Sequence, residues 1–127
     1  MTYVTETAKD VDTAVRDLEE AVKRNQFGVL HVYDLKEKLK EKGVDLANEC
    51  RILEVCNPQQ ASRVLTQNMA VSTALPCRIS VYEENGQTKM ATMLPTAMLA
   101  VFPGAKDLKP IAEEVEQQIL KMIDEAK

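Results

Sequence analysis

The chain has 127 residues and a formal net charge of −4, with 16 Lys and Arg against 20 Asp and Glu, and aromatic residues make up only 4% of it. Binding to a phosphate backbone needs a basic face, and binding to single strands uses stacking aromatic side chains, so this composition argues against a nucleic-acid partner. The length fits one domain, which we expect to span residues 1–127.

Neither a targeting segment nor a membrane span is predicted. Residues 1–5 contain no basic stretch followed by an apolar one, and the longest apolar run, 97–102, is far too short to cross a bilayer. The three cysteines, Cys50, Cys56 and Cys77, match no zinc-finger or Cys-x-x-Cys pattern. We therefore expect free thiols, a reducing cytoplasmic location and no membrane partner.

The first quarter of the chain has the pattern of a strand followed by a helix. Residues 3–6 are typical of a short strand, and Thr7 followed by Asp10 resembles a helix-capping signature. Apolar residues then recur at helical spacing, which predicts an amphipathic helix with one face on a core. These apolar residues are Val11, Ala14, Val15, Leu18, Ala21 and Val22.

Residues 27–33 are rich in strand-forming side chains and predict a second strand. In a regular strand, successive side chains point to opposite faces of the sheet. We therefore expect Val29, His31 and Tyr33 on one face. The side chains expected on the other face are Leu30 and Val32.

A short peripheral helix is expected next. Asp34 is suited to its N-cap, Glu37 follows three residues later, and Gly43 marks its end. Its only apolar residues are Leu35 and Leu39. Little of this helix can therefore be buried.

Residues 51–56 predict a third strand that leads directly into a helix start. Asn57 is suited to the N-cap, Pro58 to the first helical position, and Gln60 lies three residues after the cap. The expected buried stripe of this helix consists of Ala61, Val64 and Leu65. A connection of small and polar residues, 68–74, is expected after it.

The remaining chain predicts a hairpin and a last helix. Residues 77–82 and 87–94 have strand patterns, and Asn85-Gly86 between them is the strongest short hairpin signal. Residues 96–102 are apolar but ambiguous in type, and a helix starts near residue 107. Its apolar stripe consists of Leu108, Ile111, Val115, Ile119, Met122 and Ile123.

This order of elements predicts an α+β fold: a five-stranded, mostly antiparallel sheet with two long helices on one face. The other face of the sheet must be solvated or covered by a partner. Because the strands supply apolar residues to both faces, we expect a homodimer.

Two cysteine turns are the only unusual features of the chain. Cys56 ends the third strand, and Cys77 opens the fourth directly after Pro76. If these strands are antiparallel neighbours, the two thiols lie close together. The helix that starts after Cys56 favours negative charge and lowers a thiol pKa, whereas apolar burial raises it. Alternatively, both cysteines are small buried hydrophobic residues.

Glu54 and His31 extend this group of candidate residues. Glu54 shares a strand face with Cys56, and His31 lies mid-strand. Together with both thiols they could offer ligands for zinc or iron. The spacing matches no metal motif, however, and nucleophilic catalysis would need the sole histidine beside a thiol, which nothing local provides. No metal ligand and no catalytic residue is assigned, and a cofactor stays open.

Four segments, in this order, carry a resemblance to a known family: Phe27-Gly28-Val29-Leu30, Asp34-Leu35 with Lys38 and Gly43, Ile52-Leu53-Glu54-Val55-Cys56-Asn57-Pro58, and Leu75-Pro76-Cys77-Arg78. They resemble the bacterial and archaeal domain of unknown function 302 family over about residues 5 to 100. The resemblance implies a TATA-binding-protein-like domain, β-α-β-β-β-β-α with an extra helix in the meander, that associates as a homodimer. It points to Cys56, Asn57, Pro58, Pro76 and Cys77, with Glu54 and Gly28 in support, and assigns none of them a role.

Three hypotheses about function follow. The first is a ligand-binding or interaction module with a site for a small molecule or ion. The candidate ligand-binding residues of that site are Cys56, Asn57, Pro58, Cys77, Glu54 and His31. The second is redox chemistry, sulfur handling or metal binding by Cys56 and Cys77, which requires one thiol with a lowered pKa. The third is that both turns are structural, and the sequence does not decide whether the protein is an enzyme.

Overall fold

A five-stranded antiparallel sheet with the strand order β1-β5-β4-β3-β2 is the centre of the fold in the computed structural model, which describes residues 1–127. The strands are β1 (Thr2–Thr7), β2 (Gly28–Asp34), β3 (Cys50–Cys56), β4 (Cys77–Glu84) and β5 (Gln87–Met93). The helices are α1 (Val11–Arg24), α2 (Leu35–Glu41), α3 (Pro58–Gln67), α4 (Pro95–Leu99) and α5 (Ala105–Ala126), with a 3₁₀ helix η1 (Met69–Ala74). The predicted fold class is confirmed.

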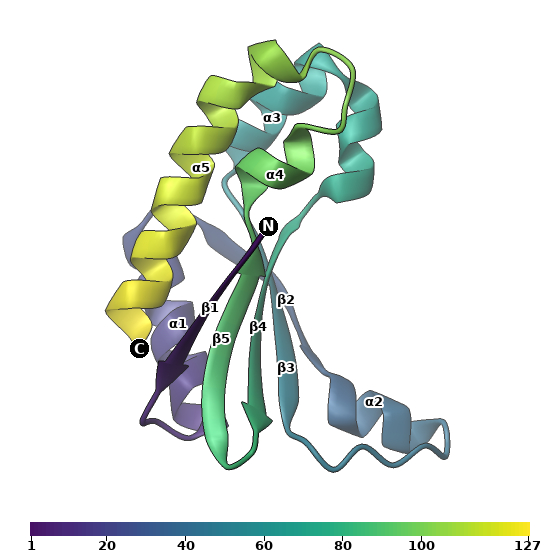
Figure 1. Ribbon diagram of the computed structural model, residues 1–127, viewed down its shortest axis with the longest axis vertical. Helices are drawn as coiled ribbons and strands as arrows, with labels where there is room; N and C mark the ends of the chain where they lie inside the picture. Colours follow the sequence, from purple (N-terminus) through teal and green to yellow (C-terminus); the bar gives the residue numbers. More distant parts are fainter.

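Helices α1 and α5 pack on one face of the sheet (Figure 1). Every apolar residue predicted for the inner stripe of α1 is buried. They join residues of α5 and of the three central strands in one core, which includes Leu18, Leu53, Ile79, Met90 and Met122. The opposite face of the sheet, called the open face below, is covered by neither helix.

A second, smaller core lies beyond the end of the sheet. It is formed by α3, η1, α4 and the first half of α5, which together are called the helical lobe (Figure 1). Its buried residues are Val64, Val71, Leu99, Leu108, Ile111 and Ala112. The apolar segment of ambiguous type, 96–102, therefore belongs largely to this lobe, where Thr96 donates a hydrogen bond to Glu116 of α5 at 2.6 Å.

Local signals in the sequence account for most element boundaries. Asn57 caps α3, and the positive φ angles of Asn85 (54°) and Gly86 (77°) suit the tight hairpin between β4 and β5. The capping residue of α1 is Asp10, whose carboxylate accepts a hydrogen bond from the Thr13 amide at 2.8 Å. Thr7 is not a cap but the last residue of β1. Asp10 takes the capping role because the amide that its side chain accepts from lies three residues later in the chain.

Helix α2 projects from the bottom of the sheet in Figure 1 and buries no residue, as expected. Charged contacts attach it to the start of β3. Lys36 lies 3.4 Å from Glu49, and Arg51 of β3 lies 3.4 Å from Asp34, the N-cap of α2. None of the helices in the structure combines the length and the apolar character of a membrane span.

A β-bulge in β2 changes the expected faces of this strand. Val29 pairs with Val55 and His31 pairs with Glu54, so Leu30 is an extra residue without a partner on β3. Val29 therefore packs on the main core together with Val32, and its predicted place beside His31 is wrong. His31 and Tyr33 do share the open face, with ring centroids 4.2 Å apart in an edge-to-face arrangement.

Candidate functional site

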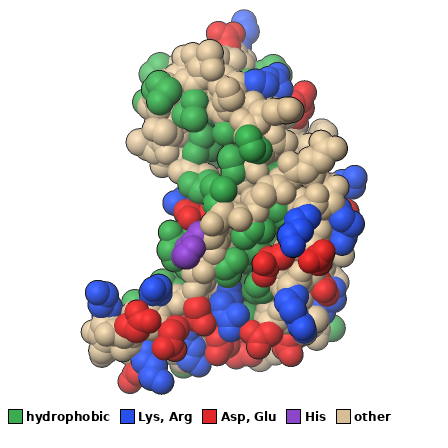
Figure 2. All heavy atoms as spheres, turned by 180° about the vertical axis from the view of Figure 1, so that it is seen from behind, with side chains coloured by type: hydrophobic (Ala, Val, Ile, Leu, Met, Phe, Trp, Pro, Cys, Tyr) green, Lys and Arg blue, Asp and Glu red, His purple; other side chains and the backbone are tan.

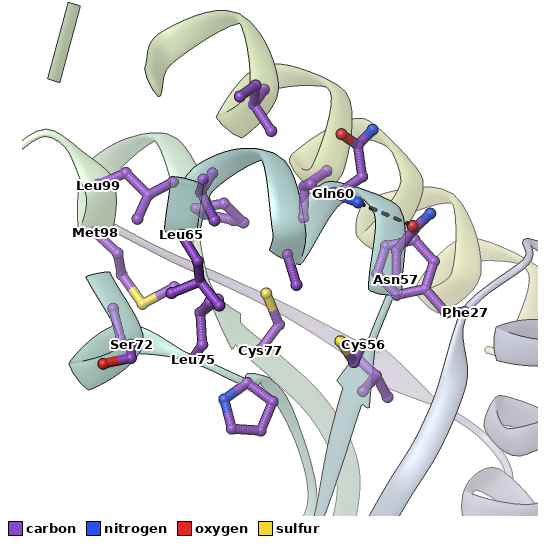
Figure 3. Close-up of a pocket in the computed structure, with 18 of the residues that line it drawn as sticks. Phe27, Cys56, Asn57, Gln60, Leu65, Ser72, Leu75, Cys77, Met98 and Leu99 are labelled. Atoms are coloured by element: carbon purple, nitrogen blue, oxygen red, sulfur yellow. Dashed lines mark hydrogen bonds between the residues drawn. The ribbon is translucent and has the colours of Figure 1, made fainter. Parts of the chain in front are cut away.

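A pocket of about 340 Å³ lies where the ends of β3 and β4 meet the helical lobe (Figure 3). Its walls come from the starts of α3 and β4, from η1 and α4, and from the middle of α5. Fourteen of its 19 lining residues are hydrophobic, and none is charged. The chain thus builds a neutral, largely apolar cavity beside its two cysteine turns, which is called the cysteine pocket below.

Cys56 and Cys77 both line the cysteine pocket, at the adjoining ends of β3 and β4. Strands β3 and β4 are antiparallel neighbours, and Cys77 pairs with Val55, the residue directly before Cys56. Both cysteine side chains line the cavity (Figure 3), and their mutual influence raises the pKa of Cys77. The prediction that the two residues are neighbours in space, beside a helix start, is confirmed.

Burial, rather than the helix start, controls the acidity of both thiols. It raises the pKa of Cys77 to about 11, with a smaller contribution from Cys56 and an opposing one from Arg78. Burial also raises the pKa of Cys56. The lowered pKa that thiol chemistry requires is therefore found at neither residue.

The N-cap of α3 explains why the helix start does not activate Cys56. The Asn57 side-chain oxygen accepts hydrogen bonds from the amides of Gln59 and Gln60, at 3.1 and 3.2 Å. Pro58 has no amide hydrogen. The donors that would stabilise a thiolate, or a bound anion, at this helix start are thus already occupied or absent. Asn57 also lines the pocket, whereas Pro58 lies outside it.

His31 and Glu54 lie on the open face, outside the pocket. The paired registers of the three strands place Glu54 of β3 between His31 of β2 and Arg78 of β4. Arg78 Nη2 lies 3.1 Å from Glu54 Oε2, and a hydrogen bond to Glu54, together with its charge, raises the pKa of Tyr33. These four residues, His31, Tyr33, Glu54 and Arg78, are called the polar cluster below.

The structure does not assemble the metal site considered from the sequence. No three side chains among His, Cys, Asp and Glu lie close enough to hold a metal ion together. The physical reason is that Cys77 packs on the main core, whereas His31 and Glu54 pair across the open face. Two candidate residues therefore belong to the polar cluster, and three belong to the cysteine pocket.

Comparison with known proteins identifies the family. A family model described as "Domain of unknown function DUF302" matches residues 3–126. The chain belongs to the DUF302 family. A solved structure described as an uncharacterized conserved protein DUF302 from Bacillus stearothermophilus is 40% identical, with a TM-score of 0.92 over 99% of this chain and 98% of that one. No curated protein matches the chain.

The two segments that carry the most specific likeness to DUF302, 56–58 and 75–78, contribute five residues to the cysteine pocket. These five are Cys56, Asn57, Leu75, Pro76 and Cys77. Sequence reasoning missed the apolar residues that close the cavity from the helical lobe, notably Met98, Leu99 and Ile111. The apolar run 96–102 was the available signal, but its position over the cysteine turns depends on tertiary packing.

Proposed function

We propose that the protein is a binding module that holds a small apolar molecule, or the apolar part of one, in the cysteine pocket. The observation that carries this proposal is a cavity of about 340 Å³ with 14 hydrophobic and no charged residues among the 19 that line it. Ligand pockets in proteins have this size and this composition, with a few polar groups that orient the ligand.

The polar groups of the pocket support a neutral ligand. Asn57 uses its side-chain oxygen in the cap of α3, which leaves its amide nitrogen as a donor. The side chain of Gln60 is already occupied, since it donates to Glu114 at 2.9 Å and accepts from Arg63 at 2.7 Å. Ser72 adds a hydroxyl group at the rim. Weak thiol donors, one amide and one hydroxyl suit a molecule with few polar atoms.

The thiol-chemistry alternative receives less support. It requires a thiolate at neutral pH, and burial raises the pKa of both Cys56 and Cys77. In the binding proposal the two cysteines act as small apolar wall residues, which is the usual behaviour of buried free cysteine.

Binding of a series of straight-chain alcohols, from 1-hexanol to 1-decanol, tests the proposal by displacement of the neutral dye Nile red. Each buried methylene is expected to raise affinity about fourfold until the pocket is full. Ala61→Phe fills part of the pocket and is expected to weaken binding of the longer alcohols. Ser62→Phe is the matched control, because Ser62 is the next residue of α3 and is exposed outside the pocket. Equal affinities for all chain lengths, or an Ala61→Phe variant that binds like the wild type, would contradict the proposal.

We further propose that the chain forms a homodimer through the edge of the sheet at β1. This strand has a hydrogen-bonding partner on one side only. Val4 and Met93, which are 50% and 49% exposed, lie beside that edge on the open face. Light scattering should give twice the 14.2 kDa of one chain, and Val4→Lys should shift the mass toward the monomer. Val101→Lys, in the helical lobe, is the control, and a monomeric wild-type protein would refute the dimer.

A further inference from the structure

The polar cluster adjoins the cysteine pocket on three neighbouring strands. On β2, Leu30 lines the pocket and His31 directly follows it; on β4, Cys77 lines the pocket from the core side of the sheet, and Arg78, the next residue, lies on the open face. On β3, Cys56 lines the pocket, and Glu54 precedes it by two residues, the repeat that keeps side chains on one strand face. On β3 the open face thus continues directly from the pocket wall at Cys56 to Glu54 of the polar cluster.

The surface of the molecule places the polar cluster next to the helical lobe. Figure 2 shows the sole histidine in the concave waist of the molecule, with an acidic and a basic side chain between it and the hydrophobic side chains of the helical lobe. Leu30, directly before His31 in the chain, is 60% exposed although it also lines the pocket. A molecule held in the cysteine pocket can therefore reach the polar cluster with its outer end.

Opposite charges in the cluster differ in their access to solvent. The Glu54 side chain is 13% exposed, and its carboxylate contacts Arg78 and interacts with Tyr33. The Arg78 side chain is 53% exposed. Only one of its nitrogens makes the contact with Glu54, so further guanidinium N–H groups remain for another acceptor. His31 is exposed on the other side of Glu54, on β2. Arg78 is therefore the more accessible of the two charges for a ligand that extends from the pocket.

We infer that the ligand is a single-chain amphiphile with a carboxylate head, whose chain occupies the cysteine pocket and whose head contacts Arg78. This inference rests on the proposed function and names the chemical class of its ligand. A guanidinium group matches a carboxylate in geometry and charge, and the neutral pocket excludes the head from the interior. Glu54 holds the Arg78 side chain in place and moderates its charge.

The ratio of the affinities for decanoate and for 1-decanol tests the inference. Decanoate is used below its micelle-forming concentration and 1-decanol below its solubility limit. Arg78→Gln is expected to lower the preference for decanoate about fivefold at low salt, the size typical of a partly exposed ion pair, and to leave decanol binding unchanged. Glu54→Gln is expected to act in the opposite direction, because it removes the negative charge behind Arg78. Arg16→Gln, on the exposed side of α1, makes the same change in net charge at a distance and is expected to have no effect.

Three outcomes separate this inference from the proposed function. Loss of the decanoate preference in Arg78→Gln, with a gain in Glu54→Gln, supports it. If alcohols bind with the expected chain-length dependence but Arg78→Gln leaves the ratio unchanged, the carboxylate head is wrong and the apolar pocket stands. If neither decanol nor decanoate binds the wild-type protein, both the inference and the proposed function are overturned. Decyl sulfate and decyltrimethylammonium complete the series: tighter binding of the cation than of decanoate would also overturn the inference.

Discussion

The Cys77 thiol lies in the wall of the cysteine pocket, and burial raises its pKa to about 11 from an ordinary value of 9.0. Only the thiolate reacts with iodoacetamide. A pKa raised by two units lowers the thiolate fraction at pH 8 about a hundredfold. We therefore expect the native protein to be alkylated at Cys77 about a hundred times more slowly than the urea-unfolded chain. Peptide mass spectrometry resolves this rate from those of the other two cysteines.

The same raised pKa predicts how stability changes with pH. Below pH 9 both the folded and the unfolded chain keep the Cys77 proton, so the neutral thiol contributes its full stabilisation. Between about pH 9 and 11 the unfolded chain releases this proton while the folded protein retains it. The free energy of unfolding is therefore expected to fall by about 2–3 kcal/mol over this range because of Cys77 alone.

Comparison with Cys77→Ala isolates the contribution of this thiol. Lysine and tyrosine side chains also titrate between pH 9 and 11, but they are common to both proteins and cancel in the difference. Urea unfolding of the two proteins at pH 8, 9, 10 and 11 gives that difference directly. A difference in unfolding free energy that stays constant over this range would refute the reasoning, as would native-state alkylation at pH 8 as fast as in the unfolded chain.

Three further predictions concern residues around the site. Asn57→Ala removes the α3 cap and is expected to lower the free energy of unfolding, measured in urea, by about 1 kcal/mol. Asn57→Asp keeps the acceptor and should retain most of the stability of the wild type, so equal losses in the two variants would contradict the role of the cap. Leu53→Ala leaves a cavity in the main core and is expected to cost about 2–5 kcal/mol in the same assay, and a loss below 1 kcal/mol would argue against the packing described. Glu54→Gln is expected to lower the pKa of Tyr33 toward 10.0 in an absorbance titration, with Tyr33→Phe identifying the signal; an unchanged titration would contradict the Tyr33–Glu54 interaction.

Local signals made much of the fold predictable from the sequence. Alternating and helical apolar patterns mark the strands and the two long helices, since burial of one face leaves a regular trace in the residue order. The cap formed by Asn57 and the hairpin at Asn85-Gly86 act over a few residues and are equally visible. The closeness of Cys56 and Cys77 followed from one topological step, the antiparallel pairing of β3 with β4.

The pocket itself could not be predicted, because its far walls come from remote segments. Met98 of α4 and Val115 of α5 meet the cysteine turns only after the helical lobe has packed over the end of the sheet. Which of two opposing effects, the helix start or burial, controls the pKa of Cys56 could not be predicted for a related reason. Capping by Asn57 was visible in the sequence, but the degree of burial that determines the pKa of a thiol depends on that lobe.

Leu30 shows how one residue joins the pocket to the polar cluster. The β2–β3 ladder passes from the Val29–Val55 pair to the His31–Glu54 pair, so Leu30 is not needed for pairing. In a regular strand Val29 and His31, two residues apart, would point to the same face of the sheet. The bulge keeps Val29 on the core and His31 on the open face, and it places Leu30 between them at the pocket. β-bulges commonly redirect side chains beside functional sites. The irregularity in β2 therefore places Leu30 at the pocket. The alternation pattern of the sequence did not reveal it, because that pattern assumes a regular strand.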